Sequence, residues 1–187
     1  MRGEELEKLK KMVKKCQNCP LAKTRKNVVF GEGSCDAEIM IIGQAPGFEE
    51  DKTGRPFVGR AGKFLDKLLE IAQIKREEVF ITSPVKCFPP KNRKPKKSEI
   101  DKCLPWLWRQ IEIIRPRVFI LLGEVAFSVF FSNLKLKNFS GKLIQKEGKK
   151  FFITYHPAAG IRFPRIKTKL IKDFKKIKQL KKKKWQN

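Results

Sequence analysis

Acidic residues are scarce in this chain, which has 19 Asp and Glu against 44 Lys and Arg, for a formal net charge of +25 over 187 residues. Thermophilic proteins that are rich in Lys add Glu with it to form ion-pair networks, so thermophily does not explain this excess. A chain this basic usually binds a polyanion, and nucleic acid is the expected partner. An anionic lipid surface is the weaker alternative, because no basic helix with a wide apolar face stands out.

Long apolar runs are missing as well, and none approaches the ~20 residues that a membrane-spanning helix needs. The first residues, Met1–Glu5, are acidic and helical in character and do not resemble a signal sequence. Internal repeats are absent, and only residues 175–184 are of low complexity. We therefore expect an intracellular monomer without membrane contact, folded as a single domain over residues 1–187 and large enough for a real core.

Cysteine is the most informative residue type that is present. Cys16 and Cys19 are followed, 67 residues later, by Cys87 and Cys103 in the pattern C-x15-C. Four thiolates suit a tetrahedral zinc ion or a cubane iron–sulfur cluster. Proline and apolar residues that would exclude water follow each group, and the x15 loop is unlike a zinc ribbon, so iron–sulfur is favoured. Buried or disulfide-bonded cysteines are the alternative, and Cys35 is interpreted as a free thiol on a loop.

Apolar runs alternate with helical periodicities along the chain. The runs predict strands at 38–43, 79–82, 117–123 and 151–155, and the periodicities predict helices at 4–15, 60–73, 98–114, 124–131 and 165–187, the last rich in Lys. Ser98 with Asp101 resembles a capping box at the start of the third helix. Residues 44–59 and 88–97 are predicted loops because of their Gly and Pro content. This alternation indicates an α/β fold with a parallel sheet whose ligands bind at the carboxyl ends of the strands.

Two of the predicted strand ends carry motifs, GQAPGFEED at 43–51 and HPAAG at 156–160. With the four spaced cysteines, these motifs make the chain similar to the family 4 uracil-DNA glycosylases, the iron–sulfur branch of the uracil-DNA glycosylase superfamily, over about residues 12–165. The resemblance implies a three-layer α/β/α sandwich with a central four-stranded parallel sheet. It also implies hydrolysis of the N-glycosidic bond of deoxyuridine in DNA, which leaves an abasic site.

The resemblance further implies a 4Fe–4S cluster held by Cys16, Cys19, Cys87 and Cys103, on cluster-bearing segments 12–22 and 86–104. Its role is expected to be structural, since it would tie the N-terminal helix to the basic loop and turn cluster binding into folding energy of that region. Family members come mostly from thermophilic bacteria and archaea, so we expect a cytoplasmic, nucleoid-associated prokaryotic enzyme. Gln179-Leu180 and Trp185 are too degenerate to count as a clamp-binding motif, so a sliding clamp stays an open partner.

Several site residues follow from the same resemblance. A base in DNA must be flipped into a pocket before it can react. Phe57 is expected to stack on uracil, Ala45 to contact it, and His156, the only histidine, to donate a hydrogen bond to uracil O2 as charge grows there. Without the motif, Phe57 would be interpreted as a core residue and His156 as a structural one.

Two positions depart from the family pattern. Gln44 stands where the family typically has Glu, and it can only position water through its amide. Ser83 stands where the family usually has Asn, which pairs with both O4 and N3–H of uracil. We therefore expect slower uracil excision or a broader base range. Glu50 and Asp51 are anionic catalytic candidates, with capping of the following turn as the alternative.

Contacts to DNA are expected from three segments. Residues 158–164 resemble the family's minor-groove wedge, in which Gly160 allows close approach and Ile161 or Arg162 fills the space of the flipped nucleotide; the alternative is a connection without DNA contact. Phosphates are expected at a helix start and on the basic loop, with salt-sensitive and sequence-blind contacts. The residues are Arg60, Lys63, Lys91 and Arg93, with Lys94, Lys96 and Lys97 beside them.

Three rival functions remain open. The first is the same fold acting on hypoxanthine or xanthine. The second is a weakly active protein that binds damaged or single-stranded DNA, which the departures at Gln44 and Ser83 keep plausible. The third and most distant is a zinc-containing nucleic-acid module. The expected substrate is uracil-containing DNA, single- or double-stranded.

Overall fold

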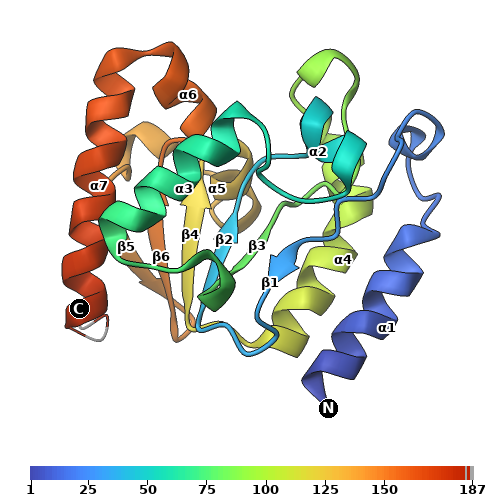
Figure 1. The fold of residues 1–187 in the computed structure, drawn as a ribbon, viewed down its shortest axis with the longest axis horizontal. Helices are drawn as coiled ribbons and strands as arrows, with labels where there is room; N and C mark the ends of the chain where they lie inside the picture. Colours follow the sequence, from blue (N-terminus) through green and yellow to red (C-terminus); the bar gives the residue numbers. More distant parts are fainter. Residues whose placement is uncertain (184, 186–187) are drawn as a thin grey trace.

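A six-stranded sheet in the order β1-β3-β2-β4-β6-β5 lies at the centre of the chain, in a computed structural model that describes residues 1–183 and residue 185 (Figure 1). The strands are β1 (Glu32–Gly33), β2 (Ile39–Ile42), β3 (Phe80–Thr82), β4 (Val118–Leu122), β5 (Lys142–Lys146) and β6 (Lys149–Thr154). β2, β3, β4 and β6 are parallel, which confirms the four predicted strands.

The prediction of a four-stranded sheet was nevertheless incomplete, because β1 and β5 add antiparallel edges. β1 has only two residues, too few for a periodic signal. β5 has the sequence KLIQK and contains no fully buried residue, so its pattern lacks the apolar run that marks a central strand. The sheet is therefore mixed, with a parallel centre.

Helices cover both faces of the sheet. They are α1 (Arg2–Lys14), α2 (Phe48–Thr53), α3 (Arg60–Ala72), α4 (Lys97–Ile114), α5 (Glu124–Phe130), α6 (Pro157–Arg162) and α7 (Pro164–Lys182), with short 3-10 helices at Pro20–Lys23, Arg76–Glu78, Pro90–Asn92 and Leu136–Asn138. α1, α4 and α5 pack on one face and α3 and α7 on the other. None of the described helices is long and apolar enough to cross a membrane.

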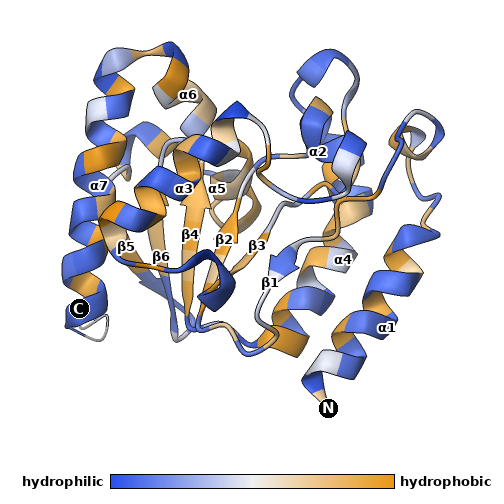
Figure 2. Cartoon of the chain, in the orientation of Figure 1, coloured by the Kyte–Doolittle hydropathy of each residue, from blue (hydrophilic) through white to orange (hydrophobic). Residues whose placement is uncertain are grey.

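The strands read as unbroken apolar runs because both of their faces are buried. In β2, Met40 and Ile42 join the core under α1, α4 and α5, whereas Ile39 and Ile41 join the core under α3 and α7. The pleat sends successive side chains to opposite faces, so a strand between two helical layers needs apolar residues at every position. Figure 2 shows the result, with hydrophobic strands between helices whose outer sides are hydrophilic.

Two local predictions were wrong. α4 begins at Lys97, and its capping box uses Glu99, whose Oε2 accepts from the Lys96 amide at 2.7 Å, in place of Ser98 and Asp101. Asp101 instead forms an ion pair with Lys97. The segment predicted as a loop at 44–59 contains α2, with Gly47 as its N-cap. The segment at 158–164 overlaps α6, which begins at Pro157 with His156 as its N-cap.

Candidate functional site

A pocket opens at the carboxyl ends of the parallel strands, bordered by α2, the start of α3, the 88–97 loop and α6; α2 and α6 lie along the upper side in Figure 1. It gathers most of the predicted site residues, and its lining includes Gln44, Ala45, Glu50, Phe57, Arg60, Ser83, Arg93, His156 and Ile161. The remaining ones lie outside the lining: Asp51 is buried, Gly160 is packed under α7, and Lys63, Lys91 and Arg162 are exposed.

His156 follows β6 and caps α6. Its Nδ1 accepts from the Ala158 amide at 3.2 Å, so the proton of a neutral ring lies on Nε2. Burial lowers the pKa of His156 to about 4, against a smaller opposing effect of the Glu50 charge. At neutral pH the ring is therefore an uncharged hydrogen-bond donor in the pocket.

Phe57 lies against this ring, with centroids 5.6 Å apart and planes at 26°. At that separation the two rings are in direct contact, so a base has to approach the pair from the pocket side. Phe57 has a φ of 51°, a conformation that costs a non-glycine residue energy. Gly43 and Gly62 allow this loop to approach, because a Cβ on Gly43 would lie 2.6 Å from the Phe57 ring and one on Gly62 would lie 1.8 Å from its carbonyl oxygen.

Glu50 holds this strained loop in place. Its Oε1 accepts from the amides of Val58 and Gly59, each at 2.8 Å, and its Oε2 accepts from the Gly47 amide at 3.1 Å. Asp51 is buried and accepts from the amides of Lys26 and Asn27 at 2.9 and 3.3 Å. Glu50 thus makes the contact with the following turn that was the alternative to a catalytic role, whereas Asp51 binds the amides of an earlier segment at Lys26 and Asn27.

Ser83 lies buried at the end of β3, where its hydroxyl donates to the Val85 carbonyl oxygen at 2.7 Å. This bond commits the hydroxyl proton, so the oxygen can offer only lone pairs to the pocket. Arg93 also has a fixed partner, because its guanidinium forms two hydrogen bonds to Glu99, at 2.6 and 2.8 Å.

Lys86 is a buried residue that sequence reasoning missed. Its Nζ donates to Thr82 Oγ1 at 2.6 Å, to the Ser83 carbonyl oxygen at 2.7 Å and to Gln110 Oε1 at 2.6 Å. Burial lowers the pKa of Lys86 to about 7. In a chain with 44 basic residues, a single lysine is expected at the surface. The signal that could have identified Lys86 was its place between the apolar Val85 and Cys87.

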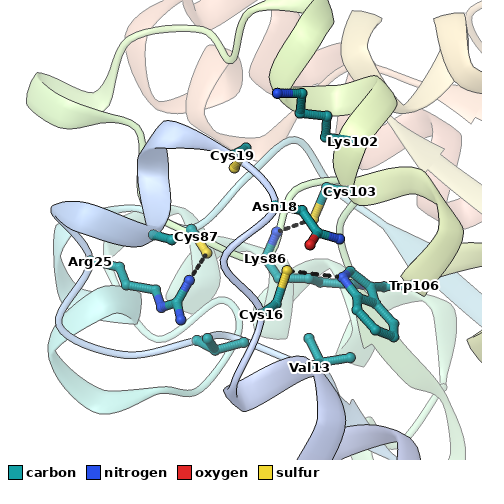
Figure 3. Close-up of a pocket in the computed structure, with 12 residues that line it drawn as sticks. Val13, Cys16, Asn18, Cys19, Arg25, Lys86, Cys87, Lys102, Cys103 and Trp106 are labelled. Atoms are coloured by element: carbon teal, nitrogen blue, oxygen red, sulfur yellow. Dashed lines mark hydrogen bonds between the residues drawn. The ribbon is translucent and has the colours of Figure 1, made fainter.

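The four cysteines of the predicted set line one cavity beside this lysine (Figure 3). Cys16 and Cys19 follow α1, Cys87 follows β3, and Cys103 lies in the second turn of α4. Three N–H groups point at their sulfur atoms: Trp106 Nε1 at 3.3 Å from Cys16, the Lys86 amide at 3.3 Å from Cys103, and an Arg25 nitrogen at 3.5 Å from Cys87. Cys35 is not among the lining residues, and its sulfur lies 3.6 Å from Asp36 Oδ2.

The donor set of this cavity fits an iron–sulfur cluster. Burial raises the pKa of Cys103 to about 12 and also raises that of Cys87, so their thiolates need a cationic group beside them. Among the described residues, no three Cys, His, Asp or Glu side chains are close enough to hold a single metal ion. Four thiols that line one cavity, with N–H donors to three of the sulfurs, suit a cluster of several metal atoms.

Comparisons with known proteins point to one family. A model described as the uracil DNA glycosylase superfamily matches residues 30–179. The type-4 uracil-DNA glycosylase of Saccharolobus solfataricus is 50% identical over 177 residues, which cover 89% of this chain and 82% of the relative. That of Thermotoga maritima is 47% identical over 160 residues, covering 84% and 83%. A type-5 uracil-DNA glycosylase of Pyrobaculum aerophilum is 33% identical over 144 residues, covering 67% and 63%.

Proposed function

Because the chain belongs to the uracil DNA glycosylase superfamily, with type-4 enzymes among its relatives over most of their length, we propose that it removes uracil from DNA. It hydrolyses the N-glycosidic bond of deoxyuridine and leaves an abasic site. The observation that carries this function is the pocket at the strand ends in which His156 and Phe57 lie together. The net charge of +25 supports DNA as the substrate.

His156 is proposed to stabilise the leaving base. As the glycosidic bond breaks, negative charge develops on uracil O2, and the Nε2–H of a neutral imidazole donates to it. Support comes from the Nδ1 contact with Ala158, which fixes the tautomer, and from the lowered pKa, which keeps the ring uncharged. A donor of this kind contributes roughly 10²–10³ in rate.

Ser83 is proposed to read the base. Since its hydroxyl donates to Val85, its oxygen is left as an acceptor, which matches the N3–H of uracil. Cytosine has no hydrogen at N3 and so leaves this acceptor unpaired. Gln44 and Ala45 are proposed to contact substrate as well, Gln44 by positioning the attacking water, because both line the pocket.

Glu50 and Asp51 are proposed to act through the loops that they hold. Glu50 anchors the segment that carries Phe57, and Asp51 ties α2 to the chain at Lys26. Phe57 stacks on the flipped base from a conformation that these bonds maintain. DNA contacts are proposed at Arg60, Arg93 and Ile161 because these residues line the pocket. They are proposed as well at Lys63, Lys91, Gly160 and Arg162, which lie within two residues of the lining along the chain.

A 4Fe–4S cluster is proposed for the cavity of Cys16, Cys19, Cys87 and Cys103. When bound, it would supply a cross-link between the segment after α1 and α4. The N–H donors from Trp106, Lys86 and Arg25 would stabilise the charge on its sulfur ligands. We further propose that the protein acts as a monomer on genomic DNA in the cytoplasm of a prokaryote, and a sliding clamp remains an untested partner.

The second candidate is excision of hypoxanthine. Its ring carries an N–H next to a carbonyl, so the Ser83 acceptor would accept it as it accepts uracil. This possibility rests on Ser83 alone and is tested with the same set of substrates.

The test is excision from single-stranded and U·G duplex oligonucleotides by the cluster-loaded protein, with hypoxanthine- and xanthine-containing strands alongside. We expect uracil to be released and the His156→Ala variant to be at least ~10²-fold slower, while its thermal unfolding changes only by the loss of the α6 cap, about 1 kcal/mol. Tight DNA binding without release of any base would contradict the proposed function and leave a binding protein.

A further inference from the structure

The mouth of the pocket carries an aromatic side chain that the proposed chemistry does not use. Phe48, the first residue of α2, lines the pocket although 52% of it is exposed. Its ring meets that of Phe88 edge to face, with centroids 6.5 Å apart and planes at 73°. Lys26 Nζ lies 6.0 Å from the Phe48 centroid. The ring therefore has Phe88 and the Lys26 ammonium as neighbours, and about half of the residue stays open to solvent.

The backbone under this ring is held in place. Gly47, immediately before Phe48, donates its amide to Glu50 Oε2 at 3.1 Å. Asp51, one turn further on, accepts from the Lys26 amide at 2.9 Å, which fixes the chain that carries the neighbouring cation. An exposed aromatic group held in this way loses little conformational freedom when it binds a ligand, which favours binding.

The surroundings of Phe48 favour a nucleic acid over an apolar protein segment. Lys26, Lys91 and Lys94 are exposed, and none of them forms a salt bridge within the part of the chain that the structure describes. Lys26 lies at the Phe48 ring, and Lys91 and Lys94 belong to the 88–97 loop, whose Phe88 contacts that ring. Glu49, next to Phe48 in the chain, is exposed and opposes a phosphate locally, but it is one charge against three. An aromatic side chain with cations on the neighbouring segments, next to a base pocket, has the composition of a site that stacks a base and holds its phosphate.

We propose that Phe48 is a stacking platform for the nucleobase next to the flipped uridine in single-stranded DNA, an inference that rests on the proposed function. In a duplex, the neighbouring base stays stacked within the helix and has less need of the platform. In a single strand, the base is free, and stacking on Phe48 replaces its lost neighbour. The pocket mouth would thus have two apolar sides, Phe48 on α2 and Ile161 on α6, where Ile161 is 39% exposed.

The test pairs protein variants with altered substrates. Phe48→Ala and Phe48→Trp are compared on single-stranded oligonucleotides in which the base on the 5′ or the 3′ side of uracil is intact or replaced by tetrahydrofuran. Both KM and kcat for uracil release are measured, together with the dissociation constant for the same strands carrying a non-cleavable 2′-fluoro-deoxyuridine. Leu134→Ala is the matched control, because Leu134 is also an exposed apolar residue (44%) and does not line the pocket.

With both neighbours intact, Phe48→Ala is expected to raise KM and the dissociation constant about 5-fold or more, with kcat nearly unchanged. Phe48→Trp retains wild-type values, and Leu134→Ala changes nothing. Removing the base that stacks on Phe48 raises the KM and the dissociation constant of the wild type by the same factor, and Phe48→Ala then has no further effect. The effect on a duplex is smaller.

An equal effect of Phe48→Ala whichever neighbour is removed, or no effect at all, overturns the platform. Because binding is measured independently of cleavage, this outcome is distinct from failure of the proposed function. That failure would appear as a wild-type protein that binds these strands without releasing uracil.

Discussion

The base pocket and the cysteine cavity are held together in different ways. In the pocket, the protein itself supplies the bonds: Glu50 accepts from three backbone amides, and the Ser83 hydroxyl donates to the Val85 carbonyl oxygen. Around the cysteines, the apolar support is small, with Leu21, Val85 and Cys87 forming the local core. The pocket is thus preorganised by its own chain, whereas the cysteine segments would draw part of their stability from the proposed cluster.

The largest difference is expected from breaking the cavity. Cys103→Ser should remove one of the four ligands of the proposed cluster and abolish the visible absorption that such a cluster gives. Proteolysis within residues 12–22 should increase at least ~10-fold, because cluster binding no longer opposes opening of that segment. Uracil release at moderate temperature should fall much less. Cys35→Ser is the matched control, since Cys35 lies outside the cavity. If Cys103→Ser reduced uracil release as much as it destabilised residues 12–22, the pocket and the cavity would be one folding unit.

Lys86 joins the two regions, so its removal should affect both. Lys86→Met leaves Thr82, the Ser83 carbonyl and Gln110 without their shared donor, at a cost of about 3 kcal/mol in the free energy of unfolding. The KM for uracil should rise, since Ser83 lines the pocket. Denaturant unfolding and excision kinetics measure the two effects. Lys102→Met is the control, an exposed lysine that likewise precedes a cavity cysteine; similar losses in both variants would refute the link.

A smaller effect is expected from substituting Ser83, the residue proposed to recognise the base. Ser83→Asn restores both a donor and an acceptor, so uracil release and the preference for uracil over cytosine should rise about 10-fold. Ser83→Ala removes the acceptor and should lower both. Thermal unfolding of each variant shows whether the buried site accepts the change. An unchanged preference in a well-folded Ser83→Asn protein would mean that other groups read the base.

The smallest effect at neutral pH is expected from the charge state of His156, because its contribution to stability appears only as the pH falls. The pKa of His156 is lowered to about 4 in the folded protein, from an ordinary value of 6.5. The unfolded chain therefore binds this proton first as pH falls, and stability decreases between pH 6.5 and about 4. His156→Ala should flatten this part of the profile of unfolding temperature against pH. Since the chain has a single histidine, one imidazole NMR signal reports the titration directly, and a midpoint near 6.5 would contradict the burial effect.

Sequence patterns predicted the elements whose signal is local and strong. The four parallel strands follow from apolar runs such as residues 117–123, and Cys103 lies in the helix that periodicity predicted. Short or half-exposed elements were not predicted from the sequence, because β1 has only two residues and β5 is mostly polar. α6 escaped because Ala158-Ala159-Gly160 reads as a flexible connection, although Pro157 suits the first turn of a helix.

The assignment of contacts was decided by tertiary structure. Sequence left Glu50 and Asp51 open between catalysis and capping of the following turn. Only the tertiary structure shows which amides they bind, at Val58 and Gly59 for Glu50 and at Lys26 for Asp51. Likewise, the sequence indicated only that Arg93 lies in a basic loop, and the structure shows that its guanidinium binds Glu99.

By itself, the sequence determined the basic charge, the four spaced thiols, the single histidine and the alternation of strands and helices, because each is a property of residue type or of short-range periodicity. The tertiary structure brought the four predicted thiols into one cavity, and it alone decided that Lys86 is buried between the two sites and that Phe48 is exposed at the pocket mouth. Those features depend on which distant segments the packed sheet brings together, and burial and hydrogen bonding exist only once those segments meet.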